Sequence, residues 1–144
     1  MPSRLYSTAT PGKPLAGARV SLKDIFHLAG TKTTMGSRDY AALYGPQEET
    51  AAYVQTLIRK GAVVVGKTKM TQFASSDEPT DQWVDFHCPT NPRGDRYQSP
   101  SGSSSGAAAA LAGYDWLDFS VAGDCKTPCC PVPQSTISTL THAA

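Results

Sequence analysis

The sequence predicts an α/β fold, in which helices alternate with the strands of a sheet. Three observations favour this class. The short alternating run "ARVSL" (Ala18 to Leu22) is typical of a strand, and it ends at Lys23-Asp24. An amphipathic helix is expected over Gln47–Lys60, because Val54, Leu57 and Ile58 share one face. The run "AVVV" (Ala62 to Val65) follows directly and is typical of a strand buried on both faces of a parallel sheet.

The predicted helix is marked at both of its ends. Pro46 precedes it, and Glu48 and Glu49 lie in its first turn, where acidic side chains interact favourably with the helix dipole. Two basic residues occupy its last turn, and Gly61 follows as the expected C′ residue. These signals predict a helix that leads straight into the next strand.

The rest of the chain divides into loop, helix, strand and two irregular ends. An Ala-rich helix is expected from about Ala107, and "FSVA" (Phe119 to Ala122) predicts another strand. Residues 1–17 are rich in Pro, Gly, Ser and Thr and predict a flexible lead-in. Residues 125–144 contain no Gly, Asp, Glu or aromatic residue, although all 12 glycines lie upstream. A boundary after Asp124 and a disordered tail are therefore expected.

Composition excludes several classes of function. With 40% hydrophobic and 17% charged residues, the chain is typical of neither a disordered nor a membrane protein. A net charge of +1 without a basic block gives no reason to expect a nucleic acid or an anionic membrane as partner. No secretory signal is visible, so a cytoplasmic protein is expected. The spacing of its 4 cysteines and 3 histidines indicates no metal site, and no cofactor is expected.

Two segments carry side chains suited to chemistry, and each has two interpretations. Lys23 is either an exposed strand cap or a buried base, since burial lowers the pKa of a lysine. "SGSSSG" (Ser101 to Gly106) is either a flexible linker or a loop of backbone amides at a helix N-terminus, where a developing anion would be stabilised. The strong helix former "AAAALA" directly after it favours the loop. Lys67 is expected to be a solvated lysine at a strand end.

The order of the motifs resembles the amidase signature family, whose members cut amide bonds with a Ser–cis-Ser–Lys triad. "LKD" precedes "GTKTTMGS" (Gly30 to Ser37), "GAVVVGKTKM" (Gly61 to Met70) and "PSGSSSG" (Pro100 to Gly106). These segments lie over the family patterns "KD", "G..TT.GS", "GA..(I/V)GKTNM.EF" and "PGGSSGG". The resemblance covers about Ala18 to Asp124. It implies an α/β/α sandwich around a mixed sheet, of which this chain holds the first part.

The resemblance also implies roles for individual residues. Lys23 corresponds to the triad lysine and Ser103 to the bridging cis-serine, while Ser104, Gly102 and Gly106 support the loop. In the family, the neutral lysine takes a proton through the bridging serine, and a second serine attacks the amide carbonyl. Backbone amides of a "GTD.GGS" loop stabilise the oxyanion. The implied function is hydrolysis of the carbon–nitrogen bond of a small-molecule amide.

The chain departs from the family at the nucleophile. "VAGD" (Val121 to Asp124) lies over the start of "GTD.GGS", but "CKTPCCP" follows and places Pro128 or Thr127 where the serine is expected. Proline has no hydroxyl, and Thr127 lacks the paired glycines. We therefore expect residues 18–124 to be an incomplete amidase domain, truncated before the nucleophile and inactive alone. A retained intron or a frameshift would explain the altered composition of the tail.

Two other functions stay open at this point. One is a non-catalytic binding or interaction module that keeps part of the amidase fold. The other is an active short hydrolase that uses Thr127 as its nucleophile. The oligomeric state and the identity of the amide cannot be derived from these motifs.

Overall fold

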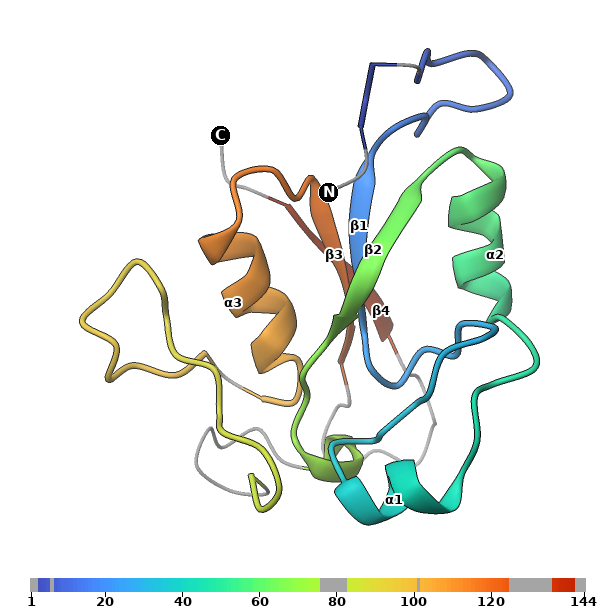
Figure 1. The fold of residues 1–144 in the computed structure, drawn as a ribbon. Helices are drawn as coiled ribbons and strands as arrows, with labels where there is room; N and C mark the ends of the chain where they lie inside the picture. Colours follow the sequence, from blue (N-terminus) through green and yellow to red (C-terminus); the bar gives the residue numbers. More distant parts are fainter. Residues whose placement is uncertain (1–2, 6, 76–82, 101, 125–135, 142–144) are drawn as a thin grey trace.

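The computed structural model describes residues 3–5, 7–75, 83–100, 102–124 and 136–141 (Figure 1). Within these ranges the strands form one sheet in the order β2-β1-β3-β4. The elements, in chain order, are β1 (Arg19–Lys23), α1 (Arg38–Leu43), α2 (Ala52–Arg59), β2 (Val63–Thr68), the short 3₁₀ helix η1 (Gln72–Ala74), α3 (Ser105–Gly113), β3 (Phe119–Asp124) and β4 (Thr136–Thr141).

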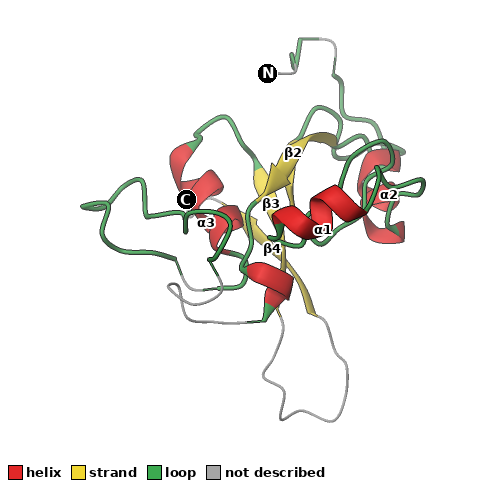
Figure 2. Cartoon of the chain, turned by 60° about the horizontal axis from the view of Figure 1, so that its bottom comes forward, coloured by secondary structure: helices red, strands yellow, loops and turns green. Residues whose placement is uncertain are grey.

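The sheet is mixed, and helices lie on both of its faces. β1 pairs in parallel with β2 and with β3, whereas β4 is antiparallel to β3. Helices α2 and α3 lie on opposite sides of the sheet (Figure 1). Helix α1 and η1 lie beyond the carboxyl ends of β1 and β2, as Figure 2 shows with this end turned forward. This arrangement confirms the predicted α/β class and is a partial version of the expected sandwich.

The alternation of side chains along β1 decides what each face of the sheet carries. Val20 and Leu22 are fully buried and form a core cluster with Val54 and Leu57 of α2. Successive side chains of a strand point to opposite faces. Lys23 therefore points to the face covered by α3, which places its amine next to the start of that helix.

Helix α2 starts five residues later than its sequence signals predict. Residues 47–51 form hydrogen bonds with the loop that follows β1 instead of with one another. The backbone N–H of Gln47 donates to the Thr31 carbonyl, and the N–H of Ala51 donates to the His27 carbonyl. These tertiary bonds keep the segment out of the helix until Ala52. The expected end is confirmed, because Gly61 has a φ of 95° and follows the last turn.

The valines of the run "AVVV" lie in an outer strand and are less buried than predicted. We predicted a strand buried on both faces, but the three valines of β2 are half-buried and Gly66 is exposed. The reason is position in the sheet, since β1 occupies the centre and β2 is the outer strand in the described part of the chain. All five residues of β1 are buried instead.

The N-terminal segment contacts residues that adjoin β3 and α2, and the C-terminal segment forms a strand. Arg4 donates to the Asp118 carboxylate at 2.7 Å, and the backbone N–H of Leu15 donates to the Lys60 carbonyl. The tail expected to be disordered contains β4 between residues 136 and 141, so the prediction is wrong for these residues. Residues 125–135 and 142–144 of that tail lie outside the described residues. The flexibility of residues 1–17 stays a prediction.

No helix in the described residues is long and apolar enough to span a membrane. The cytoplasmic location expected from the sequence stays a prediction.

Candidate active site

Lys23 occupies the buried end of the central strand. The residue is 1% exposed, and its Nζ donates hydrogen bonds to the Ser103 Oγ at 2.5 Å and to the Gly123 carbonyl at 2.9 Å. Of the two interpretations of Lys23, the structure shows the buried amine and not the exposed strand cap. The strand alternation of β1 and the loop before α3 together produce this contact.

The serine-rich segment is a packed loop from Gly102 onward. The Gly102–Ser103 peptide bond is cis, and Ser103 is 6% exposed. The Ser103 carbonyl accepts from the backbone N–H of Thr71 at 3.1 Å. Ser104 donates through its Oγ to the Gly123 carbonyl at 2.8 Å. A flexible linker would make none of these buried contacts, so the linker interpretation is wrong for these residues.

Gly106 fixes how closely the loop approaches the strand end. Its backbone N–H donates to the Lys69 carbonyl at 3.0 Å. A Cβ at this position would overlap the Lys69 carbonyl oxygen and would lie 2.5 Å from the Lys69 nitrogen. Both are backbone atoms, which cannot move aside as a flexible side chain does. A glycine is therefore required where α3 begins, and it holds the serines against the end of β2.

The structure brings together three of the predicted site residues. Lys23 and Ser104 both donate to the Gly123 carbonyl, and Lys23 also contacts Ser103. Gly102 precedes Ser103 at the cis bond, and Gly106 lies in the first turn of α3. Thr127, the remaining candidate, lies outside the described residues, as does Pro128.

This arrangement is suited to moving a proton. A neutral amine in hydrogen-bond contact with a hydroxyl can accept its proton, and burial favours the neutral form of a lysine. The N-terminus of α3 lies beside the same hydroxyl, and the dipole of the helix favours negative charge there. The chemistry available is thus the activation of a hydroxyl group.

A second buried pair was missed by the sequence analysis. Lys67 is a mostly buried residue and not a solvated one, because its Nζ lies 3.2 Å from the Asp24 Oδ1 and donates to the Thr33 Oγ1 at 2.9 Å. Burial lowers the pKa of Lys67, although the Asp24 carboxylate opposes this shift. The Asp24 Oδ2 accepts from the backbone N–H groups of Thr34 and Met35, each at 2.8 Å. The sequence places Asp24 next to Lys23. It gives no sign that Lys67, at the end of the neighbouring strand, is the lysine that pairs with Asp24.

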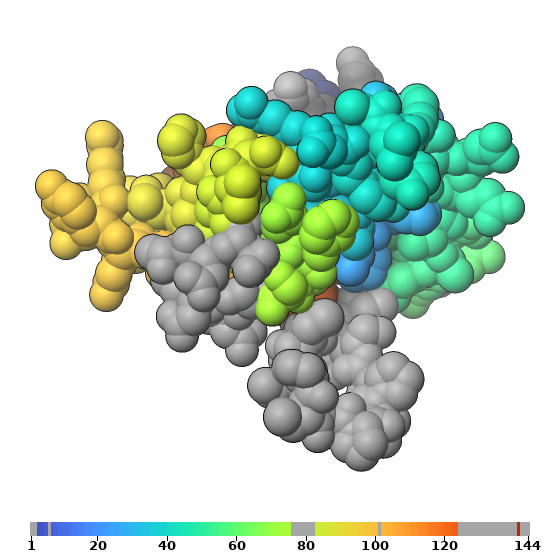
Figure 3. Space-filling view, turned by 90° about the horizontal axis from the view of Figure 1, so that it is seen from below, coloured from blue at the N-terminus to red at the C-terminus, as the bar shows by residue number. Residues whose placement is uncertain are grey.

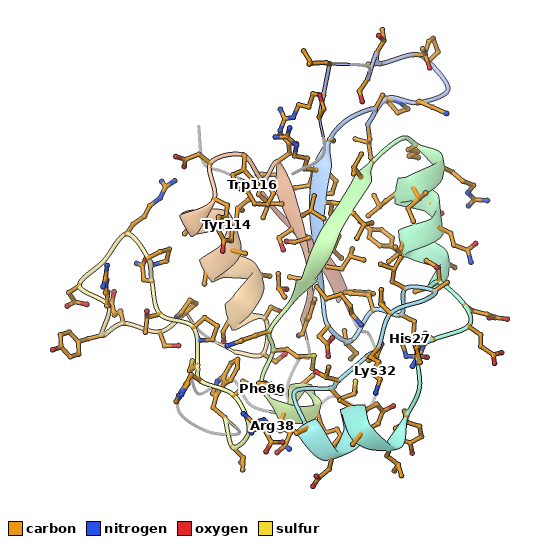
Figure 4. All side chains as sticks on the ribbon, viewed as in Figure 1. His27, Lys32, Arg38, Phe86, Tyr114 and Trp116 are labelled. Atoms are coloured by element: carbon orange, nitrogen blue, oxygen red, sulfur yellow. The ribbon has the colours of Figure 1, made fainter. Side chains whose placement is uncertain are left out.

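A large hollow of the described surface lies beside the Lys23–Ser103 pair without including it. Its volume is about 680 Å³, and it opens between β2 and α3. Tyr114 and Trp116, whose ring centroids are 5.2 Å apart, form its upper wall in Figure 4. Ser21 and Gly106 line it as well, so it reaches the face of the sheet that carries Lys23.

No group of three or more His, Cys, Asp or Glu side chains suited to a metal ion occurs among the described residues. Within that part of the chain, Cys88 is a free thiol.

Comparison with known proteins gives a consistent result. The sequence profile of the amidase family matches residues 3–125. A component of the glutamyl-tRNA(Gln) amidotransferase of Deinococcus deserti is 45% identical over 101 residues, which are 69% of this chain and 19% of that protein. The protein named translocon at the outer membrane of chloroplasts 64, from Pisum sativum, is 34% identical over 111 residues, which are 77% of this chain and 18% of that protein.

Solved structures give the same fold. The allophanate hydrolase of Kluyveromyces lactis matches with a TM-score of 0.67 and 29% identity, over 78% of this chain and 17% of that one. The chain spans about a fifth of the length of the curated relatives it matches.

Proposed function

Because this chain belongs to the amidase signature family, we propose that its Lys23–Ser103 pair is the proton relay of an amide hydrolase. The observation that carries the proposal is the buried contact between the Lys23 amine and the Ser103 hydroxyl at 2.5 Å. The substrate class is a small-molecule amide, and the bond broken is its carbon–nitrogen bond.

The relay works through two proton transfers. The neutral Lys23 amine accepts the Ser103 proton, and Ser103 in turn takes the proton of a nucleophilic hydroxyl that attacks the amide carbonyl. The two transfers then run in reverse, so that the proton held by Lys23 returns through Ser103 to the amide nitrogen. The carbon–nitrogen bond breaks, the amine leaves, and water hydrolyses the acyl-enzyme that remains. The Gly123 carbonyl accepts hydrogen bonds from both Lys23 and Ser104. It therefore holds the amine and the serine loop in fixed positions relative to each other.

The proposed relay lacks the nucleophilic serine that the family resemblance leads us to expect. The chain carries Thr127 and Pro128 where the resemblance expects the nucleophilic serine. A relay without a suitable hydroxyl beyond Ser103 has no group to activate. We therefore expect the chain to have no amide turnover by itself.

The experiment restores the nucleophile and asks whether the relay uses it. A triple variant, Lys126→Gly, Thr127→Gly and Pro128→Ser, rebuilds the glycine–glycine–serine pattern after Asp124. Each chain is treated with a fluorophosphonate, which reacts covalently with activated serines, and the labelled residue is located by mass spectrometry. We expect labelling at position 128 of the triple variant only. Adding Lys23→Ala or Ser103→Ala is expected to abolish it.

Two results would contradict the proposal in different ways. Labelling at position 128 that persists with Lys23→Ala would show that the pair is not a relay. Amide turnover by the unaltered chain that disappears with Lys23→Ala, Ser103→Ala and Thr127→Ala alike would show that the chain is a complete enzyme with a threonine nucleophile.

A second candidate function is a non-catalytic interaction module. It is favoured by the absence of a serine at the nucleophile position and by the relative from Pisum sativum, whose name describes a translocon component. If this alternative holds, the triple variant acquires no labelling. The unaltered chain then still unfolds in one cooperative transition.

A further inference from the structure

A smaller hollow at the carboxyl ends of β1 and β2 carries an excess of positive charge. Its volume is about 300 Å³, and its charged lining residues are Asp24, Lys32, Lys67 and Lys69. In Figure 3, which views the molecule from this end, the cyan segment before α1 and the green segment after β2 lie side by side. The hollow is thus built from two segments far apart in the sequence.

Two of its four charges are used within the protein. Lys67 contacts three acceptors, which are the Asp24 carboxylate, the Thr33 Oγ1 and the Lys32 carbonyl. These contacts occupy all three protons of its ammonium. The Asp24 carboxylate is held in turn by its own loop. This pair adds no net charge and offers no donor to a ligand.

Lys32 and Lys69 supply the remaining charge of +2. The Lys32 Nζ donates to the Ala41 carbonyl at 2.7 Å, which uses one proton and leaves two. The structure gives the Lys69 side chain no partner within the described ranges of the chain. Both residues are exposed, so their ammonium groups are accessible from solvent.

The uncharged lining is partly apolar, and it also includes Gly36 and the hydroxyl-bearing Thr34 and Thr68. Both hydroxyls donate within the protein, that of Thr34 to the Asp24 carboxylate and that of Thr68 to the Leu22 carbonyl.

Met70 and Phe86 form the apolar part of the wall. In Figure 4, Phe86 and Lys32 lie apart from each other in the lower half of the molecule. The volume lies at the lower limit of ordinary ligand sites. Two ammonium groups beside a partly apolar wall match a short hydrocarbon chain with a carboxylate at each end.

We propose that this hollow binds a small organic dianion, a dicarboxylate of four or five carbons, between Lys32 and Lys69. The site is separate from the Lys23–Ser103 pair, and its occupation does not depend on amide hydrolysis. It adjoins the serine loop, because the Lys69 carbonyl accepts from the backbone N–H of Gly106.

The test is a titration of the full chain, followed by amide chemical shifts in ¹⁵N NMR spectra. Succinate and glutarate are the probes, succinamide is the neutral control, and inorganic phosphate is the competing anion. We expect saturable shifts in residues 32–36 and 67–70 with the dicarboxylates. Lys32→Met and Lys69→Met should each raise the dissociation constant about fivefold. Lys60→Met, at the exposed residue that caps the C-terminus of α2, should leave it unchanged.

Several results would overturn the proposal. Equal shifts with succinamide would exclude recognition of charge. Tighter binding of phosphate at the same amides would exclude an organic dianion. An equal loss of affinity with Lys60→Met would show a general charge effect, and shifts that do not saturate in the millimolar range would show that there is no site.

Discussion

Lys23 and Ser103, which are 80 residues apart in the sequence, meet in a buried hydrogen bond of 2.5 Å. The contact depends on two local structures. Strand alternation turns the lysine towards α3, and the loop before α3 turns the hydroxyl towards the strand. Because both groups are removed from water, losing this contact would leave each with one hydrogen-bond partner fewer and no solvent to replace it.

The first prediction concerns the stability of this contact. Ser103→Ala removes one acceptor from the buried Lys23 amine and should lower the free energy of unfolding by about 1–3 kcal/mol. Ser104→Ala is the matched control, since Ser104 is less buried and its removal leaves Lys23 bonded to the Gly123 carbonyl. It should have a smaller effect. Urea denaturation followed by circular dichroism measures both, and equal losses would contradict the prediction.

The second prediction concerns Gly106. A Cβ there would lie 2.5 Å from the Lys69 nitrogen, so Gly106→Ala should destabilise the chain by about 3 kcal/mol or more. Gly66→Ala is the control, because a Cβ at Gly66 would meet nothing within 4 Å. Thermal unfolding of the two variants measures the difference. A Gly106→Ala chain as stable as the Gly66→Ala chain would show that the loop does not need this close approach.

The sequence predicts features that depend on neighbouring residues better than features that depend on contacts between distant residues. The alternation "RVSLK" predicts β1, and motif order pairs Lys23 with Ser103 through the family resemblance. Composition and periodicity alone gave no way to join residues 80 positions apart. The central place of β1 and the outer place of β2 were not predictable either, since strand order depends on pairings between distant segments.

The errors in local structure have the same origin. The residues from Gln47 onward favour a helix. However, backbone N–H groups of residues 47–51 donate to the carbonyls of Thr31 and His27, and the helix therefore begins later. Lys67 appeared solvated because a single lysine at a strand end usually is. Its burial arises from Asp24 on the adjacent strand end, which no pattern within residues 61–70 shows.

The third prediction concerns the pH dependence of stability. Burial holds the pKa of Lys67 below its ordinary value of 10.5 in the folded chain. Between the folded-state pKa and 10.5, the unfolded chain therefore binds more protons, so the contribution of Lys67 to stability rises with pH. Below the folded-state pKa both states are protonated, and the contribution is constant. The difference in unfolding free energy between the unaltered chain and Lys67→Met should thus grow in favour of the unaltered chain in this window.

Asp24→Asn tests the cause of this behaviour. The carboxylate raises the pKa of Lys67 and partly offsets the effect of burial. Without its charge, the pKa of Lys67 should fall further, and the rise in stability should begin at a lower pH. Side-chain NMR of Lys67 measures the pKa directly. A pKa that rises in Asp24→Asn would contradict the assigned electrostatics.

The last prediction concerns the tail. β4 covers the outer edge of β3 in an antiparallel register that runs from Phe119↔Thr141 to Asp124↔Thr136. β2 already leaves an outer edge among the described strands, so removing residues 125–144 would leave the sheet with two. Unpaired edges with half-buried apolar side chains favour association between copies. A chain ending at Asp124 should therefore form larger species in light scattering after size-exclusion chromatography, whereas a chain ending at Thr141 should not. If both behave alike, β4 does not protect β3, and the tail contributes nothing to the sheet.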